Sequence, residues 1–232
     1  SNDAFGQHVA CEGRFDDESN LGLIYDEAAK YYANIVLPFG KQVKKALKSL
    51  ADLEIDCICP SHGVIWRKDA AGIIQKYQQW ANHETEAKAL IVYDTMWNST
   101  LELAKMLEFG LVDADIPVIS RNLSVNHVSD VMGDVLSSRL ILLGSPTLNN
   151  SIMPTMGGFL TYLGGLRPEK RLGFAFGSYG WGGQSVKKLE EAMTGLGWEQ
   201  PQAGIKVEYI PDEPDLRDFR RIGAELGKLV QD

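Results

Sequence analysis

The sequence has few cysteines, no long apolar run and no excess of positive charge. Its three cysteines are too few for a disulfide framework and predict a reducing, cytoplasmic compartment. No apolar run approaches the roughly 20 residues of a membrane-spanning helix, so no membrane role is expected. The formal net charge of −8 argues against a nucleic-acid partner. A hydrophobic content of 44% in 232 residues is ordinary for a globular protein of one large or two modest domains.

Two of the cysteines, Cys57 and Cys59, alternate within the apolar run 55–59. In a strand their thiols would face the same side. We predict that both are small buried hydrophobic side chains, because this use of cysteine is commoner than a metal or redox pair.

The sequence pattern changes at the polar stretch 82–87, from loops and helices before it to alternating strands and helices after it. This change predicts two domains, residues 1–84 and 85–232. The first is rich in loops, and apolar spacing predicts helices over 27–36, 41–53 and 70–81 and a buried strand over 55–59. The second alternates strand and helix five times. Strands are expected over 87–93, 117–120, 140–143, 172–176 and 205–210, and helices over 100–111, 127–136, 154–163, 185–196 and 216–230.

The central strands of the second domain are continuous apolar runs, which is typical of a parallel sheet covered by helices on both faces. Five such units predict an α/β fold with a five-stranded, doubly wound sheet. Ligands of these sheets bind at the carboxyl ends of the strands, where the strand order reverses. The residues that follow each strand are therefore the candidate binding residues.

After the first strand, Thr95, Asn98, Ser99 and Thr100 lead directly into a helix. Free backbone N–H groups and hydroxyls at a helix N-terminus form an anion site. The loop lacks both G-x-x-x-x-G-K-[ST] and G-x-G-x-x-G, so a passively held phosphate monoester fits better than a nucleoside triphosphate or a dinucleotide. An ordinary helix cap explains this loop alone equally well.

Two further strand ends carry turn residues and aromatic side chains. Residues 144–150 form a turn-rich stretch, and residues 176–184 combine glycines with Tyr179 and Trp181. Glycines permit close backbone approach, and the aromatic rings, with Trp97 of the first loop, offer flat faces. The three loops together predict phosphate at one end of a site and a stacked tricyclic ring at the other.

The 95–100 loop resembles the flavodoxin phosphate loop, T-x-x-x-[ST]-[ST], and the second and third loops resemble those of flavodiiron proteins (A-type flavoproteins). That family joins a metallo-β-lactamase-like di-iron domain to a flavodoxin-like domain that binds flavin mononucleotide (FMN), and the resemblance covers essentially the whole chain. The FMN contacts it implies are Thr95, Met96, Trp97, Asn98, Ser99, Thr100, Ser145, Pro146, Thr147, Leu148, Asn149, Gly177, Ser178, Tyr179, Gly180, Trp181 and Gly182.

The first domain also resembles this family. Residues 2–8 look like the segment with an iron-bridging aspartate, and residues 60–67 look like the segment with the last histidine ligand. The resemblance implies that Asp3 and His62 are metal ligands, with His8 close by. Without it, a loop histidine such as His62 is more often not a ligand.

The sequence departs from the family in one respect: it has no H-x-E-x-D motif, which supplies other iron ligands upstream of the aspartate. Two ligands do not hold two irons. We therefore expect residues 1–84 to be the C-terminal portion of an incomplete metallo-β-lactamase-like domain. We favour the explanation that the chain is a fragment of a longer protein. The alternatives are that the missing part lies on another chain, or that a naturally truncated protein uses residues 1–82 for dimerisation.

The resemblance implies an oxidoreductase. FMN takes electrons from a rubredoxin-like donor and passes them to a di-iron site, which reduces dioxygen to water or nitric oxide to nitrous oxide, in a head-to-tail homodimer. The alternative is an FMN electron-carrier module with no functional metal site. A remnant of a zinc hydrolase is a third hypothesis, which the fused FMN domain disfavours.

Overall fold

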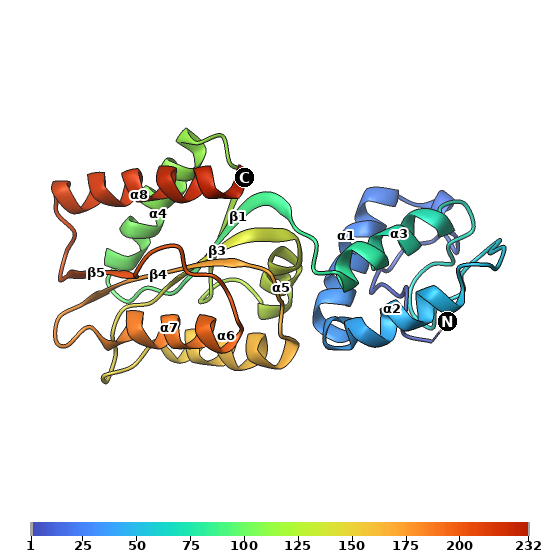
Figure 1. Ribbon diagram of the computed structural model, residues 1–232, viewed down its shortest axis with the longest axis horizontal. Coiled ribbons are helices and arrows are strands. Elements are labelled where there is room, and N and C mark those ends of the chain that lie inside the picture. Colours follow the sequence, from blue (N-terminus) through green and yellow to red (C-terminus); the bar gives the residue numbers. More distant parts are fainter. Residues whose placement is uncertain (1, 232) are drawn as a thin grey trace. The chain divides into compact units, whose positions relative to one another are not determined.

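The computed structural model describes residues 2–231 and divides the chain into two compact units (Figure 1). Unit 1 ends at Glu84 and unit 2 begins at Thr85. None of the helices within residues 2–231 has the length and apolar content to cross a membrane.

Unit 2 is built on a sheet of five parallel strands in the order β2-β1-β3-β4-β5. Figure 1 shows α4 and α8 on one side of this sheet and α6 and α7 on the other. The predicted α/β, flavodoxin-like fold is thereby confirmed. The strands are β1 (Glu86–Tyr93), β2 (Val118–Asn122), β3 (Ser138–Gly144), β4 (Leu172–Tyr179) and β5 (Ile205–Glu208).

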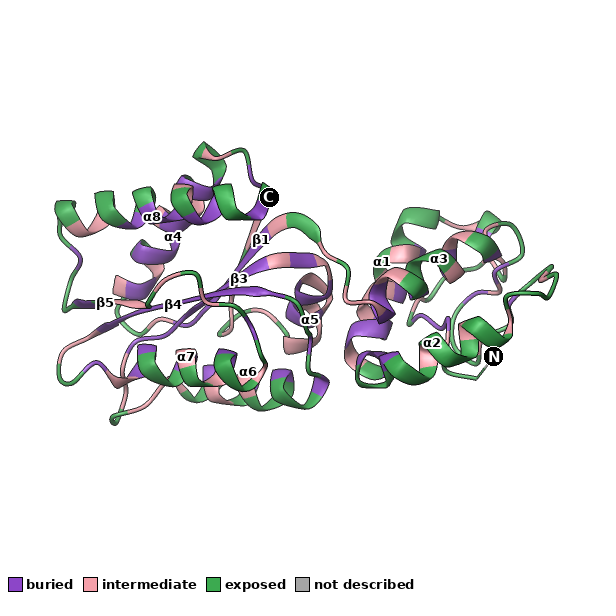
Figure 2. Cartoon of the chain, in the orientation of Figure 1, coloured by how far each residue is buried: buried purple, intermediate pink, exposed green. Residues whose placement is uncertain are grey.

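The helices of unit 2 follow the predicted pattern closely. They are α4 (Ser99–Asp113), α5 (Val128–Ser137), α6 (Pro154–Leu166), α7 (Gln184–Gly195) and α8 (Glu213–Gln231). The central strands are buried along most of their length, as Figure 2 shows for β1, β3 and β4. Burial on both faces explains why these strands read as continuous apolar runs rather than as alternating patterns.

The strand order places a crevice at the carboxyl ends of β1 and β3. From β1 the chain passes to β2 on one side and then returns to β3 on the other, so the strand order reverses at β1. The loops that leave β1 and β3 diverge at this point, which leaves room for a ligand between them.

Strand β4 is longer than its sequence predicts. Its pairing with β5 continues to the partners Tyr179 and Glu208, so residues 177–179, expected in a loop, belong to the strand. Strand β5 in turn ends at Glu208 rather than at residue 210. Both shifts move residues at the carboxyl edge of the sheet, where the candidate site lies.

Unit 1 is helical, with α1 (Leu21–Tyr31), α2 (Gly40–Ser49) and α3 (Ala70–Ala81). Helix α1 begins earlier than predicted because the Asn20 side chain caps it, accepting a hydrogen bond from the Leu23 N–H at 3.2 Å. A π-helical turn (Tyr32–Val36) and a 3-10 turn (Leu37–Phe39) connect it to α2. The core includes the buried rings of Tyr32 and Tyr77, whose centroids lie 4.9 Å apart.

The predicted buried strand over 55–59 is wrong. The segment makes one isolated bridge, between Ile58 and Trp66, and only Ile58 turns into the core. The alternating residues Cys57 and Cys59 face solvent with their sulfur atoms 4.0 Å apart, so the prediction that they are buried is also wrong. They do share one side of the chain, as an extended segment requires.

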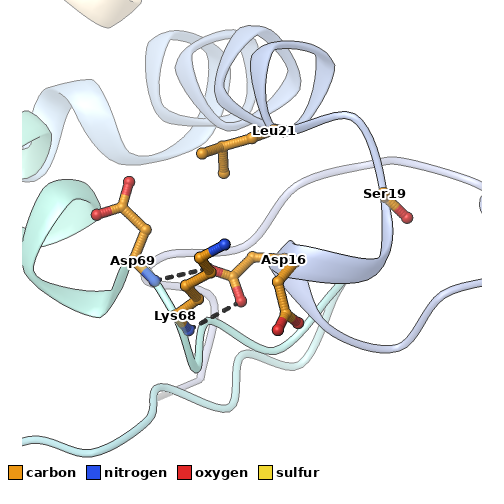
Figure 3. A pocket seen from close by; sticks show the side chains of 6 residues that line it. Asp16, Ser19, Leu21, Lys68 and Asp69 are labelled. Atoms are coloured by element: carbon orange, nitrogen blue, oxygen red, sulfur yellow. Dashed lines mark hydrogen bonds between the residues drawn. The ribbon is translucent and has the colours of Figure 1, made fainter.

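Asp16 ties the early loop of unit 1 to the segment before α3. Its buried carboxylate accepts backbone hydrogen bonds from Arg67, Lys68 and Asp69 at 2.7–3.1 Å, and Figure 3 draws the last two. Burial alone would raise the pKa of Asp16, but these hydrogen bonds lower it below its ordinary value. The neighbouring pocket of about 350 Å³ is therefore lined by carboxylates that already have structural partners, including Asp69, which accepts from Tyr25.

Candidate functional site

A cleft of about 850 Å³ lies at the carboxyl edge of the sheet in unit 2. The end of β4 and residues that follow β1, β3, β4 and β5 line it, so four separate loops meet at this edge. The lining residues are Met96, Trp97, Ser99, Pro146, Thr147, Leu148, Asn149, Asn150, Ser178, Tyr179, Gly180, Trp181, Tyr209 and Ile210.

The loop after β1 presents unused hydrogen-bond donors. Within residues 2–231 the structure gives no acceptor for the backbone N–H groups of residues 96–100. The hydroxyl of Thr95 is also buried without a partner. Asn98 adopts a left-handed backbone (φ 70°) immediately before α4, which turns this loop into the helix. Unpaired donors at a helix N-terminus form a binding site for an anion.

Buried side chains hold this loop in place. The carboxylate of Asp94 is buried and accepts a hydrogen bond from the Thr95 N–H at 2.7 Å, while its other oxygen accepts from the Thr155 hydroxyl at the start of α6. The hydroxyls of Thr100 and Ser178 lie 2.9 Å apart and connect α4 to β4. The donors are therefore positioned by the fold before any ligand arrives.

The loop after β3 is fixed against β4. The N–H groups of Ser145 and Thr147 donate to carbonyls of Phe176 and Ser178 at 3.1 and 2.8 Å. Gly177 allows this approach, because a β-carbon there would lie 2.1 Å from the Ser145 carbonyl oxygen. A tight turn follows, in which Leu148 and Ser151 exchange two backbone hydrogen bonds.

The cleft is flanked by aromatic rings that the protein leaves uncovered. Trp97 is 85% exposed and Trp181 is 87% exposed. Tyr209 follows β5 with a left-handed backbone (φ 60°), and its N–H donates to the Tyr179 carbonyl at 2.7 Å. Large apolar side chains left in solvent around a cavity are typical of a ligand site.

In unit 1, the two predicted metal ligands lie side by side. Asp3 Oδ1 is 3.5 Å from His62 Nε2, and the ring of His8 lies 5.5 Å from that of His62. Burial and the nearby Asp3 carboxylate raise the pKa of Tyr31. Within residues 2–231, however, no three histidine, cysteine, aspartate or glutamate side chains are placed to share a metal ion. Two donors do not fit a di-iron centre.

A family model described as Flavodoxin matches residues 91–223, which is more than half of the chain. The chain belongs to the flavodoxin family. This match covers the end of β1 and all of β2, β3, β4 and β5. All of the residues that line the cleft therefore lie within the matched region.

The similarity to known proteins extends beyond the flavodoxin region. A nitric oxide reductase of Moorella thermoacetica is 45% identical over 234 residues, covering 100% of this chain and 59% of that protein. A rubredoxin-oxygen oxidoreductase of Megalodesulfovibrio gigas is 36% identical, covering 100% and 58%. The crystal structure of the flavodiiron protein from Giardia intestinalis matches with a TM-score of 0.96 at 30% identity, covering 100% and 58%. The predicted resemblance to flavodiiron proteins is confirmed, and the chain spans less than two thirds of the length of these relatives.

Eleven of the 17 predicted FMN contacts line the cleft of this flavodoxin-family chain. The others, Thr95, Asn98, Thr100, Ser145, Gly177 and Gly182, lie in the same loops, in the first turn of α4 or in β4, but not in the lining. Three lining residues were not predicted: Asn150, Tyr209 and Ile210. Asn150 adjoins the predicted contact Asn149. Tyr209 and Ile210 were missed because the predicted strand runs to residue 210, whereas β5 ends at Glu208.

Proposed function

We propose that unit 2 binds FMN in the cleft and exchanges electrons through it. The observation that carries this proposal is the unpartnered Thr95 hydroxyl beside the free N–H groups of residues 96–100, at one end of an aromatic-lined cleft. A phosphate monoester would satisfy these donors, and a flat ring system would cover the exposed rings.

The roles of the residues follow from their chemistry. The Thr95 hydroxyl, the Ser99 hydroxyl and the backbone amides of the loop donate to phosphate oxygens. Trp97 and Trp181 cover the ring faces and exclude water, and the 145–149 loop offers backbone and side-chain groups to a polar ring edge. FMN, when bound, supplies one- and two-electron chemistry; the protein supplies binding, orientation and the local polarity that sets the reduction potential.

For the intact protein we infer a flavodiiron-type oxidoreductase that reduces dioxygen or nitric oxide, in which unit 2 receives electrons from a rubredoxin-type donor. Two relatives support this: one is a nitric oxide reductase and another a rubredoxin-oxygen oxidoreductase. In this proposal unit 1 is the C-terminal portion of a metallo-β-lactamase-like domain, and the protein is a cytoplasmic, head-to-tail homodimer.

The candidate metal site of unit 1 has few donors. Asp3 and His62 are proposed as ligands, but the donors within residues 2–231 do not fit two irons, so no reaction step is assigned to iron. The same observation favours a second candidate function: an FMN electron-carrier module without a catalytic metal.

Three measurements test these proposals. Flavin absorption of the purified, folded protein tests the first; a folded protein that neither carries nor takes up FMN would overturn it. Iron content and intact mass separate the two candidates. About two irons per chain, at an intact mass well above 25.7 kDa, supports the oxidoreductase. Bound FMN without iron at the mass of this chain supports the carrier.

A further inference from the structure

Helix α2 of unit 1 displays a row of four lysines: Lys41, Lys44, Lys45 and Lys48. Their spacing of i, i+3, i+4 and i+7 places them on one face of the helix. All four are exposed, whereas Val43 and Leu47 are half-buried and the helix packs against α3. We call these four residues the lysine stripe.

The lysine stripe has no charge partner in the part of the chain that the structure describes, residues 2–231. Helix α2 contains no acidic residue at all. Some exposed cations of other helices pair within the helix, as Lys187 does with Glu191 at 3.9 Å and Arg217 with Glu213 at 3.3 Å. Others within residues 2–231, such as Lys76 and Lys105, also form no ion pair, but they stand singly on their helices, whereas α2 gathers four lysines on one face.

This arrangement works against the stability of the helix. Like charges at i,i+3 and i,i+4 repel each other, and a cation in the first turn opposes the helix dipole. The stripe also stands out in a chain whose formal net charge is −8. This electrostatic conflict has no compensation within residues 2–231, and negative charge supplied from outside these residues would relieve it.

The chemistry of the helix selects among negatively charged partners. The other exposed positions of α2 are Gln42, Ala46 and Ser49, so the helix has no large apolar side chain to insert into a lipid surface. It also lacks arginine and aromatic residues, which stack on bases and grip phosphates in two-point contacts. Ammonium groups on flexible stems are point charges that suit carboxylates in a loose, hydrated contact.

We propose that the lysine stripe docks the acidic face of a small soluble protein in a transient, charge-steered complex. Such a complex forms rapidly, dissociates rapidly and weakens as salt rises. An interface held by four exposed charges is at the weak end of specific association, which suits a partner that binds, acts and leaves.

The test compares two variants that remove the same charge. In the stripe variant, the four lysines of α2 are changed to Gln. In the control variant, four exposed lysines elsewhere are changed to Gln: Lys76, Lys105, Lys187 and Lys228. Binding of a fluorescently labelled acidic rubredoxin is measured by anisotropy at low and at moderate salt, with both variants checked for folding by circular dichroism.

We expect the stripe variant to weaken rubredoxin binding about tenfold at low salt and the control variant less than twofold. Salt should reduce wild-type binding and remove most of the difference between the variants. Equal losses in the two variants, or no binding by the wild type, would overturn the proposal. Tighter stripe-dependent binding to phosphatidylglycerol vesicles or to a 20-base-pair DNA duplex would overturn it in favour of those partners.

Only the choice of rubredoxin as the probe rests on the proposed function. The binding assay involves no electron transfer, and flavin absorption is recorded on the same samples. Loss of rubredoxin binding in the stripe variant of a protein that neither carries nor takes up FMN would support docking while contradicting FMN binding. If the protein carries flavin but binds rubredoxin equally well with and without the lysine stripe, FMN binding is supported and the docking proposal is contradicted.

Discussion

Replacing Thr95 by valine should change ligand binding and protein stability in opposite directions. The Thr95 hydroxyl is buried without a protein partner, so valine, which has nearly the same shape, removes an unsatisfied polar group. Without ligand we expect the variant to be as stable as the wild type or more stable by up to about 1 kcal/mol. With FMN, it lacks one hydrogen bond to a charged phosphate, worth about 1.5–3 kcal/mol.

That loss corresponds to a roughly 10- to 150-fold higher Kd for FMN. The assay is titration of the flavin-free protein with FMN, followed by quenching of flavin fluorescence, beside urea unfolding of the same protein. Thr100→Val is the matched control, because the Thr100 hydroxyl is bonded to Ser178 at 2.9 Å and its removal leaves the Ser178 hydroxyl unpaired. This control should destabilise the flavin-free protein by about 1–2 kcal/mol.

An unchanged Kd for FMN in Thr95→Val would contradict a contact between this hydroxyl and the phosphate. A loss of stability as large as that of Thr100→Val would show that the Thr95 hydroxyl has a partner inside the protein. A ligand that lacks phosphate, such as riboflavin, provides a second check. The variant should discriminate less than the wild type between FMN and riboflavin, since the lost bond belongs to the phosphate end.

Further predictions concern the rings of the cleft and the loop of unit 1. Trp97→Ala and Ser99→Ala should each weaken FMN retention by about 1 kcal/mol or more; unchanged flavin content in both would contradict the loop assignment. Tyr209→Gly should relieve a left-handed backbone while opening the cleft, so FMN should dissociate faster from a protein of undiminished stability. Asp16→Asn should destabilise unit 1 by about 2–3 kcal/mol at neutral pH. The pKa of Asp16 is lowered in the folded protein. Its contribution to folding stability is therefore present above the ordinary carboxyl pKa and is lost as the pH falls through the lowered value. Acid unfolding of the variant should be less steep in that range.

The sheet of unit 2 is predictable from sequence because its signals are local. Runs such as residues 89–93 are apolar at every position, and each is followed by small polar residues that start a helix. Burial on both faces and helix capping are properties of adjacent residues, so they are visible without the rest of the fold. The prediction that residues 95–100 form an anion site rests on the same kind of local signal.

The errors occur where distant pairing decides the structure. Gly177 and Ser178 look like loop residues, but pairing of β4 with β5 keeps them extended. Tyr209 and Ile210 look like strand residues, yet β5 stops before them and they become part of the cleft. Local propensity does not report where a neighbouring strand ends.

The exposure of the tryptophans has an optical consequence. Trp66, Trp80 and Trp198 are buried, whereas Trp97 and Trp181 stand in solvent at the cleft. Buried indoles emit at shorter wavelengths than hydrated ones, so the emission band of the protein is the sum of two separable contributions. A cleft ligand that does not absorb in the near-ultraviolet changes mainly the long-wavelength part, whereas a flavin also quenches nearby buried tryptophans by energy transfer; unfolding shifts the short-wavelength part. A single emission spectrum therefore reports both whether the cleft is occupied and whether the chain is folded.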